Sequence, residues 1–113
     1  MLERISRIIL LKDFYGPLLT DKQQNILSLH FENDLSYSEI GDEYNISRQA
    51  VYDLVRRAEN VLEQYEEKLG LVNKFQDTNQ RLSEIQNLLK GGETDGDRIQ
   101  QAIDLLQEIN SLL

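Results

Sequence analysis

The chain of 113 residues is long enough for one domain, or one small domain with an appendage, and its 40% hydrophobic content allows a modest core. It has no cysteine, which excludes disulfides and thiolate metal sites, and 20 acidic against 12 basic side chains give a formal net charge of −8. No stretch approaches the roughly 18 apolar residues of a membrane span, and no signal peptide is recognisable, so we expect a soluble cytoplasmic protein.

The first part of the chain has the spacing of short helices. From Leu2 onward, apolar residues recur three or four positions apart, and Gly16-Pro17 ends this first helix. Thr20 and Gln23 fit a capping box, in which each residue bonds the backbone of the other at the start of a helix. The helix that follows is expected to bury Ile26, Leu27 and either Leu29 or Phe31.

A short helix and a long helix follow the polar turn "ENDLS". Ser36 and Glu39 form a second capping box, and Asn45 ends the short helix. Ser47 is a good N-cap for the long helix. The apolar stripe of the long helix consists of Val51, Leu54, Val55, Ala58, Val61, Leu62, Tyr65 and Leu69.

Beyond Gly70 the pattern predicts an antiparallel helical hairpin around the turn "KGGETDGD". The first stripe consists of Leu71, Val72, Phe75, Leu82, Ile85, Leu88 and Leu89. The second consists of Ile99, Ala102, Ile103, Leu105, Leu106, Ile109 and Leu112. Two helices cover only part of this apolar surface, which predicts a homodimer, with Ile85 and Leu88 as the residues to change in order to obtain monomers.

The stretch "YSEIGDEYNISRQAVYDLVRRA", residues 37–58, is spaced like a helix-turn-helix. The closest helix contact needs a residue no larger than alanine, and Gly41 stands there. The turn needs a left-handed conformation, which Asn45 tolerates. An ordinary corner between two helices of a bundle is the alternative. The residues expected between the helices are Ile40, Tyr44, Ile46, Val51 and Leu54.

The second helix of such a motif enters the major groove with its N-terminus first. Arginine can grip guanine or phosphate, and glutamine can pair with adenine. The global charge opposes DNA binding, so any affinity must come from this locally basic face. Its alternative is a solvated helix face, because Asp53, Asp42 and Glu43 would repel phosphates; Tyr52 could stack on a nucleotide or pack onto the preceding helix. The candidate DNA-binding residues are Ser47, Arg48, Gln49, Tyr52, Asp53, Arg56 and Arg57, with Lys22 as a further phosphate contact.

Enzymatic, metal and cofactor functions find little support in the sequence. The single histidine, His30, does not share a helix face with Glu32 and Asp34, so it is expected to be a surface histidine rather than a metal ligand. The acidic turn "ETDGD" is too short for a calcium loop. We therefore expect no catalytic activity, no cofactor and no bound metal.

The segments "KDFYGPLLTDKQ" and "YSEIGDEYNISRQAVYDLVRRAENVLEQYEEKLGL" resemble the YlxM family of small Gram-positive bacterial proteins, over roughly residues 1–75. The helix-turn-helix is also similar to the fourth domain of sigma factors. The YlxM resemblance implies a DNA-binding helix-turn-helix, with residues 47–53 on the recognition helix. It also implies a link, through gene neighbourhood, to the signal recognition particle. Gly41 departs from the alanine expected in the family.

The sequence thus predicts an all-α protein with a sigma-like helix-turn-helix domain over residues 1–70. A hairpin over 71–113 would serve dimerisation or partner binding. The leading functional hypothesis is a DNA-binding regulator with weak affinity, in which a dimer neutralises about six to eight phosphates. The rival is an adaptor that binds the GTPase of the signal recognition particle or its RNA.

Overall fold

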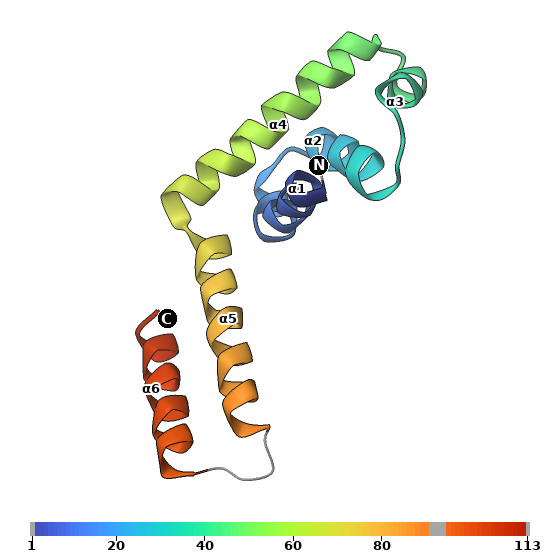
Figure 1. Ribbon diagram of the computed structural model, residues 1–113. Coiled ribbons are helices and arrows are strands. Elements are labelled where there is room, and N and C mark those ends of the chain that lie inside the picture. The colour runs from blue at the N-terminus through green and yellow to red at the C-terminus, as the bar shows by residue number, and fades with distance from the viewer. Residues whose placement is uncertain (1, 91–94, 113) are drawn as a thin grey trace. The chain divides into compact units, whose positions relative to one another are not determined.

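A computed structural model describes residues 2–90 and 95–112, and all regular structure within these residues is helical (Figure 1). The predicted all-α class is confirmed. The chain divides into two compact units, Met1–Gly70 and Leu71–Leu113. Residues 91–94 of the predicted turn lie outside the described residues. None of the described helices is long and apolar enough to cross a membrane.

The first unit contains four α-helices and two short helical turns. They are α1 (Leu2–Tyr15), the 3-10 turn η1 (Gly16–Leu18), α2 (Asp21–Leu27), the π-helical turn η2 (Ser28–Glu32), α3 (Tyr37–Tyr44) and α4 (Arg48–Leu69). The helices α1, α2 and α3 all pack on α4, the longest of them. The core consists of Ile8, Leu11, Tyr15, Leu19, Ile26, Leu27, Ile40, Val51, Val55, Ala58 and Leu62.

Both predicted capping boxes are confirmed. The amide of Gln23 donates to Thr20 Oγ1 over 3.2 Å, and the amide of Thr20 donates to Gln23 Oε1 over 3.1 Å. Ser36 and Glu39 repeat this exchange at the start of α3, with both bonds at 3.1 Å. The bond from the Ser36 amide, and then the hydroxyl of the same residue, hold the pKa of Glu39 below its usual value. Pairs of residues close together in the sequence therefore set where α2 and α3 begin.

The end of α2 differs from the expectation. Ile26 and Leu27 are buried as predicted, but the chain then widens into the π-helical turn η2, in which the amide of Asn33 donates to Ser28 O over 3.0 Å. The wider turn changes which side chains point inward, so both Leu29 and Phe31 are half-buried and neither is fully buried.

The second unit is a helical hairpin of α5 (Leu71–Leu89) and α6 (Gly96–Leu112), which lie side by side and run antiparallel (Figure 1). Arg81 Nε donates to Glu108 Oε2 over 3.0 Å across the pair. The core of the hairpin consists of Ile85, Ala102 and Ile109, with Leu88 and Leu105 packed against it.

Ile85 and Leu88, which the sequence suggested as contacts between two copies, lie instead between α5 and α6 of one copy. Ile85 is only 7% exposed, and Leu88 packs against it, so both side chains hold the hairpin together. Substituting them would test folding of the hairpin rather than association.

Candidate nucleic-acid interface

The turn between α3 and α4 has the geometry of a helix-turn-helix. Asn45 adopts the left-handed conformation, at φ 56° and ψ 46°, and the amide of Ile46 donates to Gly41 O over 2.9 Å. The hydroxyl of Ser47 then accepts a 3.0 Å bond from the amide of Ala50 and caps α4. The predicted roles of Asn45 and Ser47 in ending one helix and starting the next are confirmed.

Gly41 lies where the backbone of the turn crosses α3. A Cβ atom at this position would be 2.6 Å from Ile46 O, closer than real Cβ atoms come to a backbone oxygen. An alanine would therefore force the turn away from α3. The departure from the alanine expected by resemblance thus has a physical reason in this chain.

The residues proposed to meet DNA are exposed on the N-terminal part of α4 and on α2. Gln49 Nε2 donates to Asp53 Oδ1 over 3.2 Å, which orients the amide and leaves its oxygen and second N–H for another partner. Within the described residues, Arg48 and Arg57 form no ion pair. The exposed residues are Ser47, Arg48, Gln49, Tyr52, Asp53, Arg56, Arg57 and Lys22.

Tyr52 packs back onto the preceding helix. Its ring meets Tyr37 of α3 edge-on, with centroids 5.8 Å apart and an interplanar angle of 80°. His30 stacks on the other ring, Tyr37, at 4.4 Å, and its Nδ1 lies 2.8 Å from Leu35 O. Tyr52 is still 40% exposed, so its outer edge remains accessible. His30 is a half-buried packing residue rather than a free surface histidine, and the described residues contain no group of three potential metal ligands.

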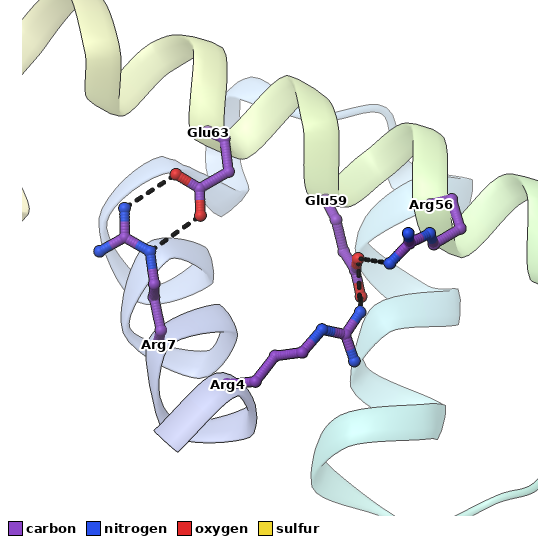
Figure 2. Close-up of polar contacts among 5 residues, drawn as sticks. All are labelled: Arg4, Arg7, Arg56, Glu59 and Glu63. Carbon is purple, nitrogen blue, oxygen red and sulfur yellow. Dashed lines mark hydrogen bonds and ion pairs between the residues drawn. The ribbon is translucent and has the colours of Figure 1, made fainter. Parts of the chain in front are cut away.

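Arg56 pairs with the carboxylate of Glu59, a residue that was not among the candidates chosen from the sequence. Glu59 is 6% exposed, and Arg4 Nη2 on α1 binds its two oxygens at 2.7 and 2.8 Å (Figure 2). Arg56 Nη1 lies 3.5 Å from Glu59 Oε2, and its guanidinium carbon lies 5.8 Å from the Tyr52 ring centroid. Arg56 therefore has a carboxylate partner within the chain, although its side chain is 52% exposed, and its contact with DNA stays a prediction.

A second pair joins α1 to α4 one turn further along. Arg7 donates from Nε and Nη2 to the two carboxylate oxygens of Glu63, over 2.9 and 2.8 Å (Figure 2). This fork raises the pKa of Arg7 above its usual value. One signal in the sequence could have identified Glu59: it falls at four-residue spacing after Val51 and Val55, on the buried stripe, where a carboxylate needs a partner.

Lys22 lies close to the recognition helix in space. It lines a shallow depression together with Arg57 and Asp53, above the half-buried side chains of Ile46 and Leu54. The start of α2 and the outer face of α4 therefore contribute cations to one surface. Arg57 and Lys22, which share this depression, and Arg48, at the first position of α4, form no ion pair with described residues.

A family model described as "Putative helix-turn-helix protein, YlxM / p13 like" matches residues 2–108. The chain belongs to this family, which is also named UPF0122. A UPF0122 protein of Desulforamulus reducens is 50% identical over 93 residues, which are 82% of this chain and 80% of that protein. UPF0122 proteins of Bacillus cereus and Bacillus thuringiensis are 40% identical over 110 residues, which are 97% of this chain and 100% of each relative.

Membership of the UPF0122 family confirms the resemblance found in the sequence and extends it. The resemblance covers roughly residues 1–75, whereas the family model continues through α5 and most of α6. The hairpin is therefore part of what defines the family, and is not an appendage peculiar to this chain. The helix-turn-helix in the family description agrees with the geometry of Gly41, Asn45 and Ser47.

Proposed function

We propose that the protein binds DNA through the N-terminal face of α4 and acts as a regulator without catalytic activity. The observation that carries this proposal is that Arg48, at the start of α4, and Arg57, nine residues further along, are exposed and form no ion pair with described residues. An α-helix of this kind fits the major groove with its first turns against the base edges. The family description supports a helix-turn-helix role.

Each side chain of this face has a distinct use against a duplex. Arg48 would grip guanine or a phosphate, and Gln49 would pair with adenine through its amide oxygen and free N–H. Arg57 and Lys22, which share one surface depression, would hold the phosphate backbone. Asp53 would repel phosphates, and so it would disfavour any approach that brings the backbone onto the middle of the helix.

The same charges predict weak binding. Arg48, Arg57 and Lys22 give three phosphate contacts per copy, so two copies on one duplex would neutralise about six phosphates. The slope of log affinity against log salt would then be about −5. Counting cations in the sequence allows up to about eight phosphates, but Arg56 is occupied by Glu59. With a net charge of −8, non-specific affinity should be at the weak end of the range of about 10⁻⁴ to 10⁻⁶ M.

Fluorescence anisotropy with labelled duplexes at low and moderate salt tests this proposal. Arg48→Ala and Arg57→Ala should each weaken binding and flatten the salt dependence. Lys68→Ala is the matched control, because it removes one exposed charge from the last turn of the same helix. Absence of DNA binding even at roughly 20 mM salt would contradict the proposal, since low salt maximises the electrostatic contribution.

A second candidate function is that of a protein-interaction adaptor. It is favoured by the large apolar side chains that the hairpin leaves exposed, among them Leu89, Ile99 and Leu106. In this hypothesis the partner is the GTPase of the signal recognition particle, or the particle's RNA, as the resemblance to the YlxM family suggests. Titrating both against the protein beside the duplexes separates the two functions. Binding to either one, without binding to DNA, would favour the adaptor.

A further inference from the structure

The hairpin leaves one apolar face uncovered. The side chains of this face are between 40% and 50% exposed, whereas those between α5 and α6 are at most 9% exposed. We call this surface the apolar face. It consists of Leu82, Leu89, Ile99, Ile103 and Leu106.

Helix geometry puts these residues on one side of the hairpin. At about 100° per residue, Leu82 and Leu89 lie about a quarter turn around α5 from the side that carries its core residues. Ile103 and Leu106 lie about a quarter turn around α6 from the side that carries its own core residues, in the same rotational sense. Because the helices are antiparallel, these equal rotations bring both stripes to the same side.

The apolar face carries no charged residue among the described positions, in a chain whose net charge is −8. The side chains interspersed with it are neutral: Thr78, Gln86 and Asn110. The opposite groove of the hairpin differs in carrying charged side chains, Glu84, Arg98 and Asp104, which lie beside Leu88 and Leu105. A charged partner could form no ion pair with the apolar face. A second copy of the face would instead bring the same apolar side chains and amides to the contact.

The size of the hairpin also favours a second copy. A core of three buried residues is small for a unit of two helices, and domains of about this length usually need oligomerisation, metals or disulfides. The 17 residues of α6 span about 25 Å, and two helices side by side are about 20 Å wide. The whole side of the hairpin that carries the apolar face therefore covers roughly 500 Å², and two such sides together reach the area of about 1,000 Å² that a specific interface requires.

We infer that the apolar face is covered by the same face of a second copy. Two hairpins then form a four-helix bundle in which each α5 and α6 has two neighbours, a quarter turn apart. The contact is related by a twofold axis, so every residue of the face meets its counterpart surface on the other copy. This inference does not depend on DNA binding, although it would supply the pairing that two half-sites require.

Sedimentation equilibrium of the full chain, without DNA, tests the inference. The wild-type protein should be a dimer at tens of micromolar. Leu106→Glu should give a monomer that keeps its helical circular dichroism, because this side chain is 50% exposed within one copy. Gln101→Glu, which adds the same charge on the same helix but in the opposite groove, should remain a dimer. A monomeric wild-type protein, or a dimeric Leu106→Glu variant, would overturn the inference.

A second measurement covers the case in which Leu106→Glu does not fold. The chain has no cysteine, so Gln101→Cys carries the only thiol and can be labelled with a nitroxide. Double electron–electron resonance should then give one defined distance between the labels of two copies. No dipolar coupling between labels would contradict a paired bundle. If dimers form but bind no duplex, the DNA-binding proposal fails and the interface stands.

Discussion

The two units of the chain are built from the same amphipathic helices, but they differ in how completely those helices are covered. In the first unit, α4 is packed by three other helices, and residues such as Leu27 and Leu62 are fully buried. In the hairpin, α5 and α6 pack on each other, and side chains such as Ile103 and Leu106 stay 40% and 50% exposed. Two helices that pack on each other bury the apolar side chains between them, and the exposed apolar side chains of the hairpin lie beside that contact.

The greatest loss of stability is expected from a substitution in the core of the first unit. Leu27 is 0% exposed, so Leu27→Ala should lower the free energy of unfolding by about 2–5 kcal/mol. Leu18 is 54% exposed in η1, and Leu18→Ala should change stability by less than about 0.5 kcal/mol. Urea unfolding followed by circular dichroism gives both values. Similar losses for the two variants would show that the first unit is not closed around this core.

Gly41 in the first unit and Gly96 in the hairpin differ in how closely their surroundings pack against them. Gly41→Ala should destabilise the protein by about 1–3 kcal/mol, because the new methyl group would lie 2.6 Å from Ile46 O. A methyl group added at Gly96, at the start of α6, would meet no atom within 4 Å, so Gly96→Ala should be neutral or stabilising by up to about 1 kcal/mol. Thermal unfolding of both variants, compared with the wild type, measures these two changes in stability. A tolerated Gly41→Ala would mean that the turn can move away from α3 at little cost.

A smaller effect concerns the charge pairs that join α1 to α4. Glu59→Gln should release Arg56 toward the recognition face and steepen the slope of log affinity for DNA against log salt by about 2 for two copies. Glu63→Gln is the matched control, because it breaks the other α1–α4 pair and leaves Arg56 untouched. Equal slopes for the wild type and Glu59→Gln would show that Arg56 reaches no phosphate in either protein.

The smallest expected effect is the titration of Glu39. Its pKa should lie below the ordinary glutamate value of about 4.3, because the carboxylate accepts bonds from Ser36. The carboxylate therefore stabilises α3 at neutral pH, and this contribution disappears as the pH falls through the lowered pKa. Carbon-13 chemical shifts measured against pH give the midpoint directly. A midpoint at or above the ordinary value would contradict the capping arrangement in solution.

Local chemistry makes part of this structure predictable from the sequence. The capping boxes, the left-handed Asn45 and the N-cap Ser47 all act on residues at most five positions away, so their patterns can be recognised directly. The close contact at Gly41 is predictable as well, although the sequence does not show that the backbone approach excludes alanine.

The errors come from partners that are distant in the sequence. Periodicity finds both apolar stripes of the hairpin, but it cannot tell which one faces inward, so it makes Ile85 and Leu88 look like contacts between copies. Glu59 lies three residues from Arg56, but its main partner is Arg4, 55 residues away, which the spacing of α4 does not reveal. The spacing of apolar residues within one helix does not show which side chains of a second helix will contact it.

The difference between near and distant bonds also implies an order of events during synthesis. The capping boxes of α2 and α3 close between residues three apart, so they can form as soon as those segments leave the ribosome. The pairs from Arg4 to Glu59 and from Arg7 to Glu63 join residues 55 and 56 apart. They must wait until α4 has been made. A nascent chain that stops before Glu59 would therefore contain the residues of both capping boxes but neither of the two ion pairs that join α1 to α4.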